Sequence, residues 1–467
     1  PYFADGALSN PINISDYWLF KYTSVSTVYA GWQYAGTTGN IKVGEGFTMK
    51  GTDGTANISD TQNYVFAGKP NNGNILLNIA PNQLYLVGNP YPSAMDADEF
   101  IKDNIKDGAG RNTTNVFNGA LSFWNHFAGQ THILADYIGG YATYTLMGGV
   151  NAISNDVLIN NNGATGTLVP RRYIPVAQGF FVGTTLDPTL VTNNPNLSTA
   201  ITGGSIVFKN SQRAFQVESP ANSVFMRIQN NHITTAVAEN EDLRPKIRLL
   251  FDSPNGLHRQ LLVGVDAQAT DQFDLGYDAT MIDVNSDDMY WEFSANKFVI
   301  QAVPDFNVNR ILPLTLKITN PGVATIKIDT LENIPDATEI YIFDQVTGIY
   351  HDIKNSNFVI TLPVGVYDNR FSVRFANETL GTDENVFNPL LIHFTNNNNN
   401  CLNIRNNDTE TIVKKVYLYN LLGQLIAHWD IENKTNIQIP VRNVSQGTYM
   451  VKVKTSNRDV RTKIMVY

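Results

Sequence analysis

The chain ends at residues 416–467 in VYLYNLLGQLIAHWDIENKTNIQIPVRNVSQGTYMVKVKTSNRDVRTKIMVY. Apolar and polar residues alternate on both sides of Asn420–Gln424, which predicts a β-hairpin with Gly423 at its turn. A short strand, NIQIPV, follows the hairpin, and Gly447 stands at the start of the longer strand TYMVKVKT. A polar turn then leads into VRTKIMVY. This succession of short strands predicts a small all-β domain at the C-terminal end.

These residues resemble the type A C-terminal sorting domain of proteins exported by the type IX secretion system. The resemblance covers about residues 388–467, and it includes the Leu-Gly-Gln turn of the hairpin and the Gly-x-Tyr element at Gly447. It also includes a last strand in which a lysine precedes Ile464-Met465-Val466. The family's first strand is commonly followed by an Asn-Pro turn, whereas this chain has asparagines at 396–400. By this resemblance the sorting signal comprises Gly423, Gly447, Tyr449, Lys463 and Val466.

The resemblance implies export across the Gram-negative outer membrane, to the medium or the cell surface. It implies two partners, the outer-membrane translocon and a shuttle barrel protein, and an Ig-like fold for the sorting domain. In many relatives this domain is cleaved and the exported protein is joined to surface lipopolysaccharide. Cargo of this system normally carries an N-terminal export signal, whereas this sequence begins at Pro1 without one. We therefore expect the chain to be the C-terminal piece of a longer polypeptide.

The composition is typical of a secreted β protein. The 467 residues suggest about three domains, and 43% apolar residues suffice for sizeable cores. Only 16% of the residues are charged, which is low for a cytosolic enzyme. A net charge of −9 without a basic patch argues against nucleic acid as a partner. Cys401 is the single cysteine, so no intrachain disulfide can form, and no apolar run approaches the roughly 18 residues of a membrane span.

Helical periodicity is confined to residues 94–105, where acidic residues early in AMDADEFIKDNI favour a helix N-terminus. Elsewhere, short runs rich in Val, Ile, Thr, Tyr and Phe are separated by Gly, Pro and Asn. This pattern predicts an all-β fold of tandem β-sandwich domains that ends in the Ig-like sorting domain. The predicted domains are an N-terminal sandwich at 1–204, a second sandwich region at 205–376 with an Ig-like half from about 312, and the sorting domain at 388–467.

Two segments of the first half resemble each other. IKVGEGFTM at 41–49 aligns with IPVAQGFFV at 174–182, and a loop and a further strand follow each of them. The alignment predicts two similar sheet edges in one sandwich, and chance similarity between two β-arches is the alternative.

Catalytic motifs give little signal. The seven histidines show no HExxH spacing, and the sequence contains no Gly-x-Ser-x-Gly elbow and no phosphate-binding loop. We therefore predict no catalytic residues and no enzymatic activity for this chain, and we assign no cofactor other than the calcium considered next.

The acidic stretch VDAQATDQFDLGYDATM at 265–281 gives the strongest indication of a binding site. Secreted β proteins often hold Ca²⁺ between loops through such carboxylates and backbone carbonyls. Asp271, Asp274 and Asp278 are the candidate ligands. In a strand, residues 271 and 278 would lie about 23 Å apart, so the ligands converge only in a tight loop, which Gly276 would permit. The alternative interpretation is a solvated turn capped by aspartates.

Aromatic residues gather near the end of the first third of the chain. Exposed rings in a groove could stack on sugars, whereas alternate residues of two strands could equally fill a sandwich core. The residues concerned are Phe123, Trp124, Phe127, Tyr137, Tyr141 and Tyr144.

These observations favour a secreted or cell-surface protein with an adhesion role, binding a surface glycan or a protein ligand. The rival class is a secreted polysaccharide-active hydrolase, or the accessory β domains of one. Convergent acids in a deep pocket would favour the hydrolase, because glycosidases work with paired carboxylates. A flat aromatic strip would favour a glycan-binding module.

Overall fold

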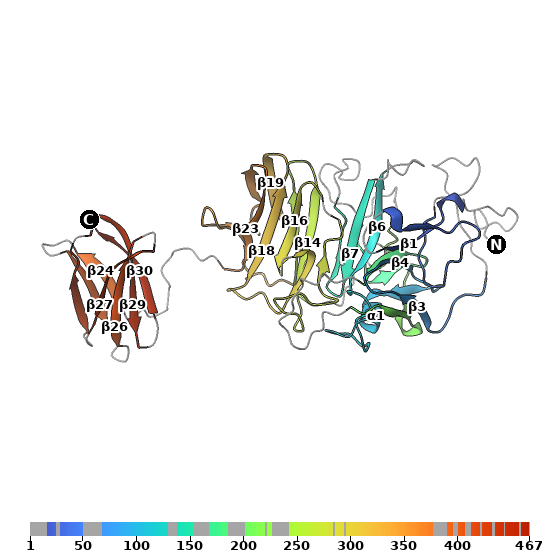
Figure 1. Ribbon diagram of the computed structural model, residues 1–467, viewed down its shortest axis with the longest axis horizontal. Helices are drawn as coiled ribbons and strands as arrows, with labels where there is room; N and C mark the ends of the chain where they lie inside the picture. The colour runs from blue at the N-terminus through green and yellow to red at the C-terminus, as the bar shows by residue number, and fades with distance from the viewer. Residues whose placement is uncertain are drawn as a thin grey trace. The chain divides into compact units, whose positions relative to one another are not determined.

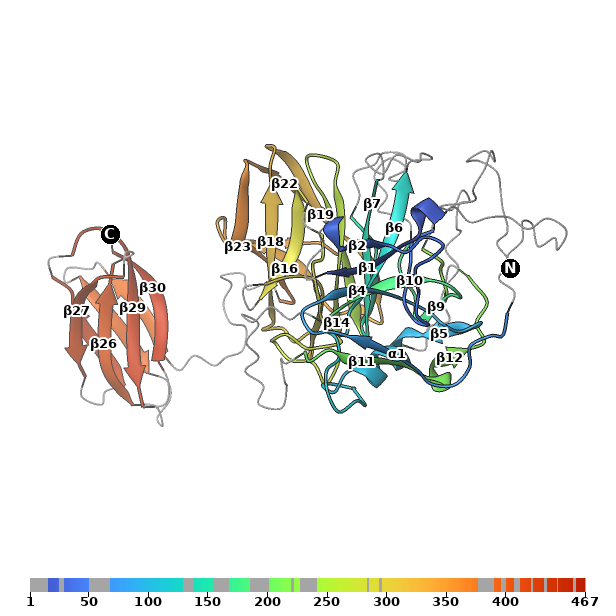
Figure 2. The same cartoon turned by 45° about the vertical axis from the view of Figure 1, so that its right-hand side comes forward.

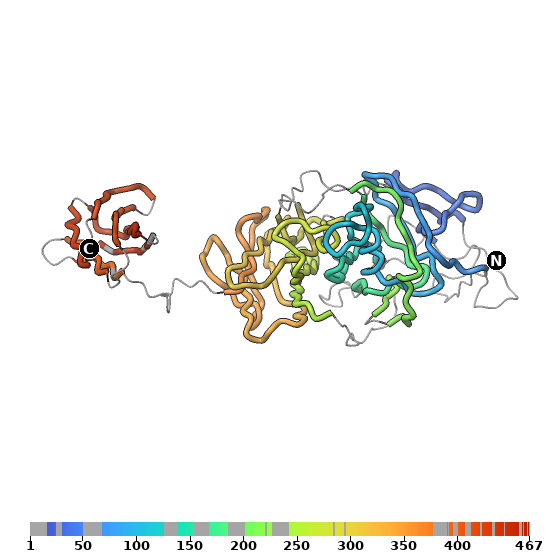
Figure 3. The backbone as a smooth tube through the Cα atoms, turned by 90° about the horizontal axis from the view of Figure 1, so that it is seen from below, coloured from blue at the N-terminus to red at the C-terminus, as the bar shows by residue number. Residues whose placement is uncertain are grey.

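The computed structural model describes residues 16–24, 29–49, 68–128, 138–153, 168–184, 201–219, 222–226, 242–283, 285–293, 296–376, 390–395, 400–406, 412–420, 423–431, 435–442, 444–456 and 459–466. The chain folds into two compact units, residues 1–378 and 379–467 (Figure 3). β-strands dominate both units, and α1 (Ala97–Asn104) is the one α-helix among the described residues. The predicted all-β class is therefore confirmed. Short 3-10 helices lie at Asp16–Trp18 (η2), Tyr29–Gly31 (η3) and Asn210–Gln212 (η5).

The first sheet of the N-terminal unit is antiparallel and has seven strands in the order β2-β1-β4-β10-β6-β7-β8. Figure 2 shows β1, β4 and β10 side by side. Side chains alternate between the two faces of a strand, so Phe123 and Phe180 enter the main core while Phe181 faces the opposite side. The strands are β1 (Phe20–Ser24), β2 (Trp32–Tyr34), β4 (Leu84–Gly88), β6 (Leu121–Ala128), β7 (Ile138–Thr145), β8 (Gly148–Val150) and β10 (Gly179–Gly183).

Two small sheets each have a strand that contacts α1, which is β11 (Gly204–Phe208) in one and β5 (Ala94–Asp96) in the other. β3 (Ile75–Ile79) pairs with β11, and β5 lies between β9 (Tyr173–Ile174) and β12 (Arg213–Ala214). The helix predicted at 94–105 begins three residues later than expected. The reason is the Asp96 side chain, which accepts hydrogen bonds from the N–H groups of Asp98 and Glu99 and so caps the helix.

The internal repeat has a structural counterpart. In each copy the fourth residue has a positive φ, which is 89° at Gly44 in residues 41–49 and 61° at Ala177 in residues 174–182. The first copy is hydrogen-bonded to one edge of β4, and the second continues into β10 on the opposite edge. The two copies therefore flank one strand of the same sheet.

The second large sheet has eleven strands and follows the order β21-β20-β23-β18-β16-β17-β14-β13-β19-β22, with β15 paired to β17. Figure 1 shows β14, β16 and β18 within it. Its β14–β17 pair is parallel and the other pairs are antiparallel. The strands are β13 (Lys246–Asp252), β14 (His258–Val265), β15 (Ala279–Thr280), β16 (Asp288–Phe293), β17 (Asn296–Val303), β18 (Ile311–Ile318), β19 (Gly322–Glu332), β20 (Tyr341–Asp344), β21 (Ile349–Asp352), β22 (Phe358–Leu362) and β23 (Gly365–Arg374).

The N-terminal unit differs from the two domains predicted for residues 1–204 and 205–376. β11 and β12 follow the predicted boundary at 204/205 but pair with β3 and β5, which precede it. Strands on both sides of residue 312 also share one sheet, because β18 pairs with β16 and β19 pairs with β13. One buried core contains side chains from both large sheets and from α1. A composition change at a loop therefore did not mark a domain boundary.

The C-terminal unit packs a sheet in the order β24-β25-β28 and a sheet in the order β27-β26-β29-β30 around a core of its own (Figure 1). The predicted hairpin is β26–β27 with Gly423 at its turn. The unit boundary at 378/379 falls between the domains predicted at 205–376 and 388–467, at residues outside the described ones. The strands are β24 (Leu390–Thr395), β25 (Cys401–Asn406), β26 (Val413–Tyr419), β27 (Leu425–Asp430), β28 (Asn436–Pro440), β29 (Gly447–Thr455) and β30 (Asp459–Val466).

Candidate functional site

The residues predicted for the sorting signal have two kinds of position in the C-terminal unit. Gly423 has a φ of 78° at the hairpin turn, where most residues with a side chain would be strained. Gly447 and Val466 face each other across β29 and β30, and the Val466 side chain is buried in the core. Tyr449 packs against the same core and donates its hydroxyl to the Ser445 carbonyl at 3.0 Å. Lys463 alone of the five is an exposed side chain on a strand.

The predicted aromatic group divides between two environments. Phe123 and Tyr144 are buried in the main core, as the packing interpretation requires. Trp124 and Tyr141 lie on the opposite face of the sheet with ring centroids 5.2 Å apart, and Trp124 is 38% exposed. Tyr141 in turn contacts the buried Phe181, so this face holds a small satellite cluster rather than an open strip. Tyr137 and the Phe127 side chain lie outside the described residues.

Asp271, Asp274 and Asp278 do not converge on one point. Asp271 is an exposed side chain that pairs with Arg310. The buried Asp274 carboxylate accepts hydrogen bonds from the backbone N–H (2.5 Å) and the hydroxyl (3.1 Å) of Thr270. Asp278 accepts from the N–H groups of Asp274 and Ala302, both at 2.6 Å.

These carboxylates act as caps within a tight loop, and Gly276, with a φ of 86°, provides the predicted reversal. Within the part of the chain that the structure describes, no three His, Cys, Asp or Glu side chains form a group that could hold a metal ion. The geometry therefore gives the calcium interpretation no support.

The buried carboxyl groups of Asp274 and Asp278 both have raised pKa values. Burial raises the pKa of Asp274 to about 6, and burial together with the Asp274 charge raises the pKa of Asp278 well above its ordinary value. Between pH 4 and pH 6 the folded state therefore holds a proton on Asp274 that the unfolded chain releases. Raising the pH through this window favours unfolding, so this contribution to stability is present at low pH and lost by about pH 6.

We expect Asp274→Asn to remove this pH dependence, because an amide has no charge to bury and can still accept from Thr270. The free energy of unfolding of the native protein relative to the variant should fall by up to about 1.4 kcal/mol per pH unit between pH 4 and pH 6. Denaturant titrations across this range measure the difference. Millimolar Ca²⁺ and a chelator should give identical melting curves. A calcium-dependent rise that Asp274→Asn abolishes would restore the calcium site.

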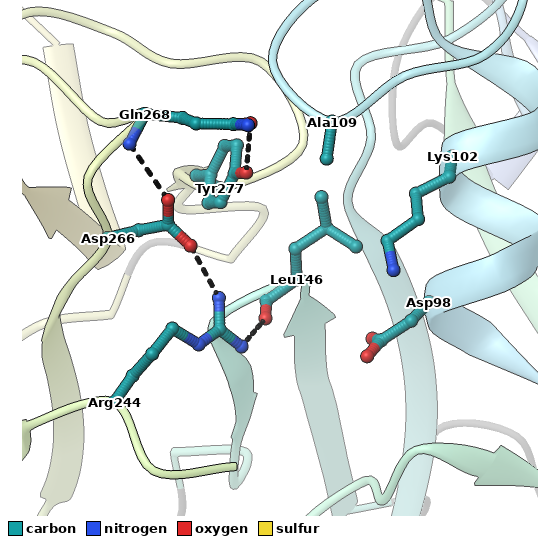
Figure 4. Close-up of a pocket in the computed structure, with 8 residues that line it drawn as sticks. All are labelled: Asp98, Lys102, Ala109, Leu146, Arg244, Asp266, Gln268 and Tyr277. Atoms are coloured by element: carbon teal, nitrogen blue, oxygen red, sulfur yellow. Dashed lines mark hydrogen bonds and ion pairs between the residues drawn. The ribbon is translucent and has the colours of Figure 1, made fainter.

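A pocket of about 280 Å³ lies beside this loop. Figure 4 shows Asp98 and Lys102 of α1 on one side of it and Arg244, Asp266 and Tyr277 on the other. Strand ends supply most of the second side, since Arg244 precedes β13 and Asp266 follows β14. Ala109, Leu146 and Gln268 complete the lining.

Each side of the pocket is held by hydrogen bonds. Arg244 donates to Asp266 at 2.9 Å and to the Leu146 carbonyl at 2.5 Å, and it also pairs with Asp242 at 2.6 Å. The Tyr277 hydroxyl donates to the Gln268 side-chain carbonyl at 3.0 Å. The guanidinium of Arg244 thus ties three segments of the chain together at the pocket wall.

The opposite side of the pocket carries the Asp98 carboxyl, whose pKa is raised. Burial and the neighbouring Asp96 raise the pKa of Asp98, while the Tyr144 hydroxyl, which donates to it at 2.8 Å, and the Arg172 charge lower it. Lys102 stands one turn further along the helix and pairs with Glu99 at 3.3 Å. Burial and the Asp266 charge also raise the pKa of Tyr277 to about 12, so its hydroxyl keeps its proton at neutral pH.

The pocket residues were not predicted from the sequence as a site. Asp266 belongs to the acidic stretch, and Asp98 was assigned only a helix-start role. The sequence does not reveal which distant segments come together, and α1 and residues 266–277 are far apart in the chain although they line one pocket. One local signal was present in the sequence, because Gly276, which reverses this loop, directly precedes the pocket residue Tyr277.

Two family comparisons cover most of the chain. Residues 3–375 match a domain of unknown function (DUF8693), and residues 394–467 match the secretion system C-terminal sorting domain. No curated protein and no solved structure gives a match. The second match agrees with the resemblance seen in the sequence and shows that the protein is cargo of the type IX secretion system, exported to the medium or the cell surface. Among the described residues, no helix has the length and apolar character of a membrane span.

Proposed function

Since this chain belongs to the DUF8693 family and ends in a secretion system sorting domain, we propose that its N-terminal unit is an exported glycan-binding module. The pocket at α1 is the proposed binding site. The observation that carries the proposal is the convergence of donors, acceptors and one aromatic ring around a pocket of about 280 Å³. The sorting domain supports a location where glycans of other cells or of the matrix are encountered.

The lining matches the chemistry of a sugar. Each sugar hydroxyl both donates and accepts hydrogen bonds, so a binding site needs both kinds of group close together. Lys102 and the Gln268 NH2 group can donate, and the Asp98 carboxyl and the Tyr277 hydroxyl oxygen, whose proton goes to Gln268, can accept. The Tyr277 ring provides an apolar surface for the C–H face of a sugar ring. The small volume favours one or two sugar units.

Lys102→Ala is expected to weaken glycan binding about tenfold, which corresponds to the loss of one charge-assisted hydrogen bond of about 1.4 kcal/mol. Lys106→Ala is the matched control, because Lys106 is an exposed lysine just beyond α1 that does not line the pocket. A glycan array identifies the sugar, and calorimetry of the full chain with that sugar gives the affinities. Equal loss of affinity in both variants, or no binding across the array, would contradict the proposal.

The rival function is hydrolysis of a polysaccharide by the same pocket. One observation favours it, since Asp98 and Asp266 line the pocket in different environments, as an acid and a base of a glycosidase do. Arg244 already binds Asp266, however, which leaves it poorly placed to activate water. We therefore propose binding without turnover. Release of sugar from chromogenic glycosides by the purified chain, lost in Asp98→Asn, would establish the hydrolase instead.

A further inference from the structure

The charge of the chain is divided unevenly between its two family regions. The full sequence has 33 Lys and Arg residues and 42 Asp and Glu residues. Ten of the basic and five of the acidic residues lie at 394–467, which leaves 23 basic and 37 acidic residues at 1–393. The sorting domain thus carries a net charge of +5 and the rest of the chain −14. A negatively charged partner is attracted to the sorting domain and repelled by the remainder.

Four of these ten basic residues, Lys415, Lys452, Lys454 and Lys463, lie on one face of the C-terminal unit. Along β26, β29 and β30, valines, leucines and isoleucines alternate with residues that face away from the core. The outward residues fall into three cross-strand rows by backbone register. We call this surface the lysine–tyrosine face, and its rows are Asp430–Lys415–Lys454, His428–Tyr417–Lys452 and Tyr419–Met450–Lys463.

Aromatic rings occupy the centre of this face. The Tyr417 ring stacks on Tyr419 with centroids 6.3 Å apart and on His428 at 6.2 Å. Lys415 pairs with Asp430 at 2.9 Å at the edge of the face. Lysines around half-buried tyrosines suit a protein interface, where aromatic anchors are surrounded by charges that set the orientation.

The outer face of the other sheet provides a contrast. On β24, β25 and β28 the residues between the buried positions include Asn403, Gln438 and Thr395, and Asn403 donates to Thr395 at 2.9 Å. Arg405 is the one lysine or arginine on these three strands. The two outer faces of one small sandwich therefore differ in charge, and a partner can distinguish them.

We infer that the lysine–tyrosine face docks the sorting domain onto an acidic protein surface of the secretion machinery. The inference rests on the sorting match and does not depend on glycan binding by the N-terminal unit. The spacing of four neighbouring strands and the length of four residues along a strand give this face dimensions of about 14 Å by about 14 Å. Such an area is a fraction of a stable interface. A transient contact fits cargo that the machinery must afterwards release.

The test uses the full chain expressed with an export signal in a type IX secretion-competent host. Lys452→Glu with Lys463→Glu reverses two charges of the face, and we expect at least a tenfold smaller amount at the cell surface and in the medium, with the protein retained in the periplasm. Lys452→Arg with Lys463→Arg keeps the charge and should be exported normally. Arg405→Glu, on the opposite outer face, should also be exported normally.

Three results would overturn the inference. Normal export of the doubly reversed protein would show that the face does not dock. Release of that protein into the medium at undiminished total yield would show instead that the face holds the protein on an anionic surface glycan after export. Melting of the purified variants separates docking from folding. If the melting curve of the doubly reversed protein shows that its C-terminal unit is already unfolded, the two lysines have a structural role only.

Discussion

Replacing Asp288 with alanine is expected to lower the free energy of unfolding of the N-terminal unit by about 3–5 kcal/mol. Asp288 and Arg259 form an ion pair with hydrogen bonds of 2.8 and 3.0 Å, and both side chains are almost fully buried. Asp283 adds a longer contact of 3.3 Å to the same guanidinium. Without Asp288 the arginine stays buried with one weak partner, because β14 places it in the core. The uncompensated charge is the source of the loss.

Two further variants separate burial from pairing. Asp271→Ala breaks an exposed pair with Arg310 and should cost at most about 1 kcal/mol, since water screens such pairs. Arg259→Met combined with Asp288→Leu removes both buried charges and should recover most of the stability. Denaturant unfolding followed by fluorescence is suitable, because Trp291 is buried in β16, the strand that also carries Asp288. Equal unfolding midpoints for Asp288→Ala and Asp271→Ala would contradict this account.

The acidic stretches show why the sequence could locate the carboxylates but could not predict which groups they bind. Asp274 and Asp278 lie in the predicted tight loop, and Gly276 reverses it as expected. What the carboxylates bind depends on partners from distant segments. Ala302 donates to Asp278 from β17, and Arg259 reaches Asp288 from β14. Spacing along the chain carries no information about such partners.

The C-terminal unit could be predicted in more detail than the N-terminal one for a physical reason. Its strands pair mostly with near neighbours, so a local alternation and a turn glycine such as Gly423 specify the hairpin. In the N-terminal unit, β3 pairs with β11 across more than 120 residues, and α1 meets the loop at Tyr277. Composition does not reveal these long-range contacts. For this reason the predicted boundary at 204/205 does not match the structure, and the pocket was not predicted.

The second large effect concerns export. Removal of residues 394–467 is expected to abolish delivery to the medium and the cell surface, because these residues are the sorting domain and have a hydrophobic core of their own. The N-terminal unit should remain folded in the periplasm, since its core contains no residue of the C-terminal unit. Resistance of the retained protein to protease, compared with the full chain, checks that folding is unchanged.

The most direct measurement is fractionation of the full chain and of the version without residues 394–467, each expressed with an export signal, in a type IX secretion-competent host and in the same host without its translocon. The account predicts that the protein reaches the surface or the medium only when both the sorting domain and the translocon are present. Export of the shortened chain, or export of the full chain without the translocon, would contradict the assignment of this protein as type IX cargo.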